Sequence, residues 1–407
     1  MIPVTEAIRI VTENTERLSV EAVALHEARG RVLAEDVQAD TDLPPFDRAL
    51  MDGYAVRSED TRGGGASVRL RLVGEAAAGN GWRGTLGTGE AVRIMTGAPL
   101  PAGADGVQQV EVTRELDEGA FVEIDKETAP GQFVSRRATE IVKGETVLRA
   151  GERLNAASLA ALSSFGCARV RVGARPRVAV LATGTELVPV EERPGPDQIR
   201  DSNSYSLAGY AEAANATVER LPFATDDAAL LERLIAECAE RSDMVVLSGG
   251  VSMGIYDFTK AALHALGARV YFERVALRPG KPTVFARLAN ARRTHVFGLP
   301  GNPVSVSVTF NLFARTALLA MQGATTPGPA EEHAVLARDV RGAAARASYL
   351  PATLASDERG RLMADPLRWA GSSDFVAFTR ATALVIVPAD VARLEAGAVV
   401  KVVRLPV

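Results

Sequence analysis

A glycine turn between a predicted strand and a predicted helix is the clearest sign of a binding site in the sequence. The apolar run Met244 to Leu247 is followed by Ser248-Gly249-Gly250, and a helix is expected to begin near Phe258. A strand that leads through glycines into a helix N-terminus exposes several backbone N–H groups at one point, where the helix dipole also favours an anion. This geometry suits phosphate, although an isolated pair of glycines more often makes only a tight turn.

Polar segments follow the other predicted strands of the same region. They are Thr183 to Glu186, Asp201 to Ser204, Thr225 to Asp227, Asp257, Arg278 to Pro282 and Gly298 to Pro303. If the strands are parallel, these segments meet at the carboxyl edge of the sheet, where ligands bind in open α/β folds. Each segment alone is explained by a cap or a turn, but together they indicate a site. Carboxylates without His or Cys suit magnesium, which commonly bridges protein acids and substrate phosphates.

The elements that would position these segments alternate between strands and helices. Strands are predicted at 178–181, 218–221, 244–247, 270–277, 283–286 and 295–298. Helices are predicted at 204–214, after an N-cap at Thr225 or Asp226, at 259–266, and at 304–321. This alternation is typical of a doubly wound α/β domain, a parallel sheet with helices on both faces.

The flanking regions have a different pattern. Residues Val4 to Glu27 have helical spacing, interrupted near Ser19, and a stiff proline linker follows at Asp42 to Phe46. Residues 66–150 contain many short apolar runs separated by Gly and Asp, which predicts a β-rich domain. Composition changes at Gly173 to Pro176 and at Gly323 to Pro329 indicate domain boundaries, and the tail from 330 to 407 again has short strands and no convincing helix.

Composition excludes several classes of function. The chain has 407 residues, enough for two to four domains, and its 47% hydrophobic and 24% charged residues are typical of a soluble globular protein. A net charge of −4 without a basic tract gives no footprint for nucleic acid, and no apolar run approaches the roughly 20 residues of a membrane span. The acidic N-terminus does not resemble a secretory signal. Two distant cysteines predict free thiols in a reducing, cytoplasmic compartment, and four scattered histidines do not have zinc-ligand spacing.

The ordered set of motifs resembles the MoeA family, the molybdopterin molybdenumtransferases that include the E domain of gephyrin. The matching segments are DRALMDGYAV, MTGAPLP, TGTEL, IRDSNS, TDD, SGGVSMGIYDFTK, RPGKP and GLPGNPVS. They extend along almost the whole chain, and MDGYAV, SGGVS and GLPGNPVS together are highly specific. The resemblance implies a multidomain α/β plus β protein that forms an elongated homodimer. It implies a mixed linker domain (1–44 and 144–175), a β-rich domain (45–143), a MogA-like α/β domain that binds molybdopterin (176–325) and a small C-terminal β domain (326–407).

The resemblance also implies an activity. Members of the family take adenylylated molybdopterin from a MogA-like adenylyltransferase, insert molybdate into its dithiolene, and cleave the pyrophosphate bond with release of AMP in the presence of Mg²⁺. The residues expected to be catalytic are Asp52, Thr96, Glu186 and Asp257, of which Glu186 and Asp257, with Asp226, are expected to bind the metal. The residues expected to bind substrate are Asp226, Ser248, Gly249, Gly250, Ser252, Arg274, Arg278, Lys281, Pro300, Pro303 and Ser372.

The chain departs from the family pattern at several basic positions. In the stretch Val134 to Glu140, Ser135 replaces an arginine, Ala138 a glycine and Glu140 an aspartate. Pro351 stands where an arginine is expected, and Arg274 where a lysine is expected. Loss of a cation near an anion pocket weakens binding by roughly 1–3 kcal/mol per charge-assisted bond, so that Arg346 or another basic residue is expected to compensate.

Four alternatives compete with this activity, and the first two follow from the departures. A divergent paralogue would use tungstate, and a gephyrin-like, non-catalytic scaffold would bind molybdopterin or proteins, although the acids at Glu186, Asp226 and Asp257 disfavour it. An adenylyltransferase of the MogA branch is disfavoured by the Asp52 and Thr96 motifs and by the additional β domains. A nicotinamide oxidoreductase is excluded because the glycine fingerprint with a following acid is missing.

Overall fold

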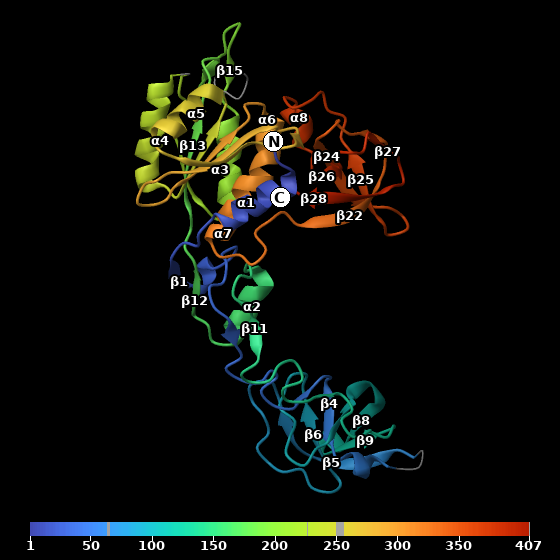
Figure 1. Ribbon diagram of the computed structural model, residues 1–407. Helices are drawn as coiled ribbons and strands as arrows, with labels where there is room; N and C mark the ends of the chain where they lie inside the picture. Colours follow the sequence, from blue (N-terminus) through green and yellow to red (C-terminus); the bar gives the residue numbers. More distant parts are fainter. Residues whose placement is uncertain (63–65, 226, 250–255, 407) are drawn as a thin grey trace. The chain divides into compact units, whose positions relative to one another are not determined.

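The computed structural model describes residues 1–62, 66–225, 227–249 and 256–406, with the backbone alone for Tyr256 and Asp257. The chain divides into two compact units (Figure 1). The first contains Met1–Glu35, Ala150–Leu159 and Ala168–Val407, and the second contains Asp36–Arg149 and Ala160–Cys167. The helix α2 (Ala156–Ser164) contributes residues to both.

A six-stranded sheet forms the centre of the first unit. Its order is β16 (Thr217–Arg220), β13 (Arg177–Ala182), β17 (Met244–Ser248), β21 (His295–Leu299), β20 (Pro282–Arg287) and β18 (Arg269–Arg274). The first four strands are parallel, as predicted, but β20 is antiparallel to both neighbours, so that a fully parallel sheet is not observed. The connections before and after β20, Val275–Lys281 and Leu288–Thr294, are too short for a parallel crossover, which needs a dozen or more residues.

Helices cover both faces of this sheet (Figure 1). The helices α4 (Ala228–Arg241) and α5 (Tyr256–Ala265) pack on one face, against Ala179, Leu181 and the neighbouring inward side chains. The helices α1 (Val4–Glu13) and α3 (Asn203–Ala213) pack on the other face, against Val178 and Val180. Alternate residues of β13 therefore belong to two separate cores, because successive side chains of a strand point to opposite faces.

A helical run from Pro303 to Met321 also packs in the second of these cores. It consists of α6 (Pro303–Thr309), a π-helical turn (Phe310–Ala314) and α7 (Arg315–Met321). By length and composition this run is apolar enough to cross a membrane. However, 94% of its most apolar stretch is buried inside the protein. It serves as the core helix of the first unit.

The C-terminal strands form a second sheet in the same unit. Its order is β19 (Leu277–Arg278), β24 (Ala347–Ser356), β25 (Leu362–Pro366), β22 (Glu331–Leu336), β28 (Val399–Arg404) and β26 (Ala383–Val387). A further pairing of β24 with β26 closes the sheet into a small barrel. The connections of this barrel contain one short strand pair, β23 (Val340–Arg341) with β27 (Arg393–Leu394), and a one-turn helix, α8 (Phe375–Phe378). The predicted strand 270–277 is thus divided, and its last residue begins β19, which belongs to the barrel.

The predicted helix from Val4 to Glu27 is wrong beyond Glu13. Residues Val20–Ala24 form the strand β1, which pairs antiparallel with β12 (Arg169–Gly173). The partner strand lies far along the chain, so local periodicity contained no information about it.

The second unit is β-rich, as expected. Its main sheet has the order β7 (Gly106–Gln109), β4 (Gly53–Val56), β6 (Glu90–Ile94), β5 (Val68–Ala76), β9 (Phe121–Ile124) and β8 (Thr113–Leu116). Two short antiparallel pairs accompany it, β2 (Val37–Gln38) with β11 (Thr146–Leu148) and β3 (Arg48–Ala49) with β10 (Val134–Ser135).

Candidate functional site

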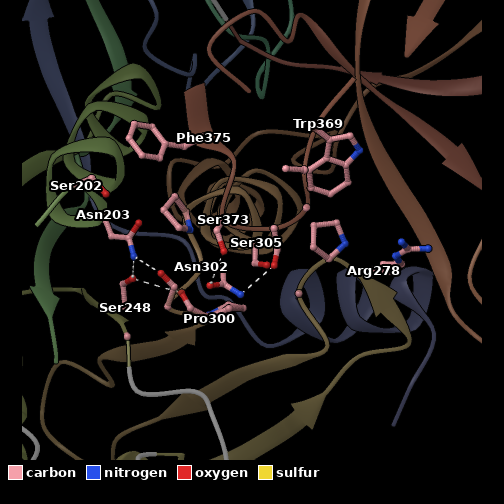
Figure 2. Close-up of a pocket in the computed structure, with 18 of the residues that line it drawn as sticks. Ser202, Asn203, Ser248, Arg278, Pro300, Asn302, Ser305, Trp369, Ser373 and Phe375 are labelled. Carbon is pink, nitrogen blue, oxygen red and sulfur yellow. Dashed lines mark hydrogen bonds between the residues drawn. The ribbon is translucent and has the colours of Figure 1, made fainter. Parts of the chain in front are cut away.

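A cavity of about 1720 Å³ lies between the carboxyl edge of the α/β sheet and the C-terminal barrel. Four of the segments predicted to meet at this edge contribute to its wall, those that begin at Thr183, Asp201, Arg278 and Gly298, whereas Thr225 and Asp227 do not line it. The loop from Arg278 to Pro282 arrives there because β20 is antiparallel and begins at this edge. The barrel contributes the opposite wall. Figure 2 shows Trp369 and Phe375 from the barrel around the cavity, together with Asn203, Ser248 and Asn302 from the α/β domain.

The glycine turn after β17 forms part of the cavity wall, and its conformation requires glycine. Gly249 has a φ of +108°, and a Cβ atom at this position would lie 1.9 Å from the Thr183 carbonyl oxygen. The turn therefore packs directly against the end of β13. Only a residue without a side chain permits this close approach of two loops.

Asn203 connects three of the loops that line the cavity. Its Nδ2 donates to Ser248 Oγ at 2.9 Å and to the Gly301 carbonyl at 2.7 Å, and Ser248 Oγ lies 3.4 Å from the Pro300 carbonyl (Figure 2). The same amide thus fixes the loop before α3, the turn after β17 and the loop after β21. Asn203 Oδ1 and Thr183 Oγ1 are buried without a hydrogen-bond partner in the described part of the chain, which leaves two polar atoms available to a ligand.

Basic side chains from both walls give the cavity a positive character. The cationic residues without an ion pair to any described residue are Arg200, Arg278, Lys281, Arg341, Arg346 and Arg368. Arg338 also lines the cavity but is paired with Asp365 at 2.6 Å. Several uncompensated guanidinium and ammonium groups around one cavity favour a multiply charged anion as ligand.

Three described carboxylates line the cavity, and two of them have partners. Asp201 is buried and accepts from Ser204 N at 3.0 Å and from the Ser204 hydroxyl. Asp339 is paired with Arg393, and the Ala396 N–H together with this ion pair holds the pKa of Asp339 below its ordinary value. Glu186 has no side-chain partner among the described residues, so its oxygens are free to bind a cation or a substrate donor.

Most predicted substrate-binding residues line this one cavity. Those described there are Ser248, Gly249, Arg278, Lys281, Pro300, Pro303 and Ser372, and Glu186, which was predicted to be catalytic and to bind the metal, also lines the cavity. Arg274 does not line it; it is exposed at the end of β18. Asp226, Gly250 and Ser252 lie outside the described residues, and only the backbone position of Asp257, in the first turn of α5, is described.

The predicted N-cap of α4 is wrong by one residue. The Asp227 side chain, rather than Thr225 or Asp226, accepts from Leu230 N at 2.7 Å. Within the described residues no group of three His, Cys, Asp or Glu side chains is arranged to hold a metal. The predicted metal set is therefore represented in the cavity by Glu186 alone, because the other two side chains are not described.

Asp52 and Thr96 lie in the second unit, and they contact each other. Asp52 Oδ1 accepts from Thr96 N at 2.7 Å and from Thr96 Oγ1 at 2.8 Å, and both residues are exposed. These bonds lower the pKa of Asp52, so that it is a carboxylate at neutral pH. The two predicted residues thus form one exposed acidic site on the loops before β4 and after β6.

The stretch Val134 to Glu140, which departs from the family motif at three positions, is held by ion pairs, and one of the replacements, Glu140, pairs with Arg48 at 2.9 Å. Arg136 and Arg137 pair with Asp47 and Asp42, and Ala138 has a φ of +63°, a conformation that favours the glycine expected there. Pro351 is buried within β24 and does not line the cavity.

Arg346, which was expected to compensate for Pro351, does line the cavity. Arg341, Arg368 and Trp369 were missed, because nothing in the local sequence of the tail shows which loop of the barrel faces the α/β domain.

Comparison with known proteins identifies the family. Models of the MoeA N-terminal region (domains I and II), the probable molybdopterin binding domain and the MoeA C-terminal region (domain IV) match residues 2–166, 179–320 and 333–405. The molybdopterin molybdenumtransferase of Bacillus subtilis (strain 168) is 35% identical over 408 aligned residues, which cover 99% of this chain and 94% of that protein. The chain belongs to the MoeA family.

Other MoeA-family proteins agree with this assignment. The molybdopterin molybdenumtransferase of Haemophilus influenzae is 34% identical and matches 94% of this chain and 93% of its own length. The crystal structure of a molybdopterin biosynthesis MoeA protein from Pyrococcus horikoshii OT3 superposes with a TM-score of 0.81 at 29% identity and full coverage of both chains. The MoeA fold therefore extends over the whole chain. Because family models also match the regions on both sides of the α/β domain, this chain differs from proteins that consist of that domain alone.

Proposed function

We propose that this chain is a molybdopterin molybdenumtransferase, which inserts molybdate into the dithiolene of adenylylated molybdopterin and releases AMP. The observation that carries the proposal is the positively charged cavity at the carboxyl edge of the α/β domain, in a chain whose full-length relatives carry this name. The substrate has a pyrophosphate link and a polar heterocycle, and molybdate is a dianion, so that each needs the N–H donors and cations that this cavity provides.

The residues of the cavity have separable roles in this proposal. The glycine turn at Gly249 and the ammonium of Lys281 bind the phosphates, while the unpartnered Asn203 Oδ1 and Thr183 Oγ1 accept from donors of the substrate. Arg278 and Arg346 face the same space from the two walls and hold molybdate. Trp369 and Phe375 offer aromatic surface to the pterin ring. Fixed donors around the reacting phosphoryl group stabilise the charge that develops during bond cleavage.

Among the described residues, the cavity offers one candidate ligand for a divalent cation. Glu186 has free carboxylate oxygens in the cavity, and oxygen ligands are those that Mg²⁺ prefers. We propose that Glu186, together with Asp226 and Asp257, holds Mg²⁺, which when bound would supply Lewis-acid polarisation of a phosphoryl oxygen.

The wider setting is proposed from the family. A homodimer, a MogA-like adenylyltransferase as source of the substrate, and a cytoplasmic location complete the proposal. The cysteines Cys167 and Cys238 are free, which agrees with a reducing compartment.

The experiment that tests the activity measures AMP release from adenylylated molybdopterin with Mg²⁺, with molybdate, with tungstate, and without either. We expect release that depends on molybdate and is lost in Asp257→Ala and reduced at least tenfold in Lys281→Gln. Lys260→Gln is the matched control, because Lys260 is an exposed lysine on α5 that pairs with Glu273 at 3.1 Å. Release that depends only on tungstate would identify the divergent paralogue, and tight pterin binding without release would support the scaffold.

A further inference from the structure

A second, smaller pocket of about 390 Å³ lies beside the helical run Pro303–Met321, and it shares no described lining residue with the large cavity. Its polar wall consists of Arg153, Asn311, Arg315, Glu332 and Arg404. We call it the Arg315 pocket. The reaction proposed above makes no use of it.

The charges in the Arg315 pocket do not balance. Both oxygens of Glu332 are occupied by Arg404, whose Nε and Nη2 donate to them at 2.9 Å each. Among the described residues, Arg153 donates to main-chain carbonyls alone, those of Gly30 at 3.1 Å and of Ala213 at 2.8 Å. Arg315 has no ion pair to any residue that the structure describes. The pocket thus contains three arginines and one carboxylate, and two of the positive charges have no acidic partner among the residues described.

The environment of Arg315 makes this imbalance unfavourable for the empty protein. Burial and repulsion by Arg153 both lower the pKa of the Arg315 guanidinium. A partly buried cation beside a second cation costs free energy unless an anion compensates it. The pocket is therefore arranged as an anion site rather than as an internal salt bridge.

Asn311 provides a second, independent sign of a ligand. It lies in the π-helical turn and is 3% exposed; its Nδ2 donates to the Ser307 carbonyl at 2.9 Å, and its Oδ1 has no partner within the described chain. Buried polar atoms are normally paired, and π-turns inside helices are frequent at functional sites. A ligand with an O–H group as well as negative charge would satisfy both Asn311 and the arginines.

We propose that the Arg315 pocket binds phosphate, either as the inorganic ion or as a small phosphate monoester with a hydroxyl group. The guanidinium groups of Arg315 and Arg153 bind the phosphate oxygens, and Asn311 Oδ1 accepts from the ligand O–H. The proposal does not depend on the transferase activity, because it concerns a separate pocket.

Thermal unfolding of the full chain with increasing phosphate tests the proposal, with NaCl added to keep the ionic strength constant. All variants are made in a Lys281→Gln background, which weakens phosphate binding in the large cavity. We expect the unfolding midpoint to rise with inorganic phosphate or with glycerol 3-phosphate, and the ligand that acts at lower concentration identifies the source. In Arg315→Gln the phosphate dissociation constant should increase at least about tenfold, whereas Arg315→Lys should retain part of the response.

Two features separate a binding role from a structural one. Without phosphate, Arg315→Gln should unfold at the same or a higher temperature than its parent, because a repelled, partly buried charge is removed. Arg114→Gln, which removes an exposed arginine paired with Glu123 in the second unit, should leave the phosphate response unchanged. An equal phosphate response with and without Arg315 would overturn the proposal, and so would the absence of any response in the parent.

Discussion

Substitution of Asn203 by alanine should lower the activity of the protein by more than the accompanying loss of stability explains. The Nδ2 atom of Asn203 donates to Ser248 Oγ and to the Gly301 carbonyl, so that alanine removes two part-buried hydrogen bonds. At about 1 kcal/mol of net stability for each bond, the free energy of unfolding should fall by about 2 kcal/mol. The two bonds also fix the positions of the turn after β17 and the loop after β21, and a displacement of about 1 Å at a reacting centre costs up to about 100-fold in rate.

Asn290 is the matched control for this experiment. It lies before the amino end of β21, at the edge of the same sheet opposite to the cavity, and its side chain bonds to Ala239 O at 3.0 Å and to Thr294 Oγ1 and N at 3.0 and 2.9 Å. Asn290→Ala should therefore lower the free energy of unfolding by about 3 kcal/mol, at least as much as Asn203→Ala.

The assay compares urea unfolding with molybdate-dependent AMP release for both variants at a temperature where both are folded. We expect kcat/KM to fall roughly 10- to 100-fold in Asn203→Ala and to stay within about twofold in Asn290→Ala. Equal losses of activity in the two variants would show that activity follows stability alone. A destabilised Asn203→Ala protein with full activity would refute the argument that this amide positions the loops.

Three further predictions follow from single contacts. Gly249→Ala should lower the free energy of unfolding by at least about 2 kcal/mol, measured by urea unfolding, and abolish AMP release, since a Cβ would lie 1.9 Å from the Thr183 carbonyl at a φ of +108°. Burial, with repulsion by Arg287 and Arg293, lowers the pKa of His295 from 6.5 to about 4. As the pH falls, His295 therefore takes up a proton in the unfolded chain before it does so in the folded protein. The free energy of unfolding, complete above pH 6.5, should decrease by roughly 3 kcal/mol as the pH falls to 4. His295→Phe should remove this loss when unfolding is measured across the same range. Because the pKa of Asp52 is lowered, its carboxylate keeps its bonds to Thr96 above the ordinary aspartate pKa and loses them as the pH falls through the lowered value. The amide chemical shift of Thr96, followed by NMR, should therefore change with a midpoint below pH 3.8. Asp52→Asn should abolish that change.

The sequence predicted the carboxyl-edge half of the large cavity because that half follows from a local rule. Ser248 ends a buried strand, Pro300 directly follows one, and Glu186 lies four residues after another, and parallel strands bring such residues to one edge. The direction of β20 was predicted incorrectly, although the short connections around it contained the information. The error did not affect the predicted site, because an antiparallel β20 begins at the edge where the other strands end.

The barrel half of the cavity could not be predicted in the same way. Arg341, Arg368 and Trp369 reach the cavity only because the barrel packs against the α/β domain, a long-range arrangement that no local period encodes. The strand β1 shows the same limit, since Val20–Ala24 is a strand only in combination with Arg169–Gly173. At Ala138 the expected glycine is replaced, and yet the backbone keeps the positive φ that glycine adopts most easily.

The pairing of β19 with β24 bears on the replacement of an expected arginine by Pro351. Leu277 and Arg278 leave the α/β sheet and pair in parallel with Ala347 and Ser348, and Ala347 N donates to the Ala276 carbonyl at 2.9 Å. Arg346 precedes this paired segment, so its backbone is held beside the loop that carries Arg278 and Lys281. We infer that the positive charge lost at Pro351 is supplied from the start of the same strand. Pro351 itself is buried in the barrel and does not line the cavity, whereas Arg346 does, so that the cavity keeps a guanidinium from this strand.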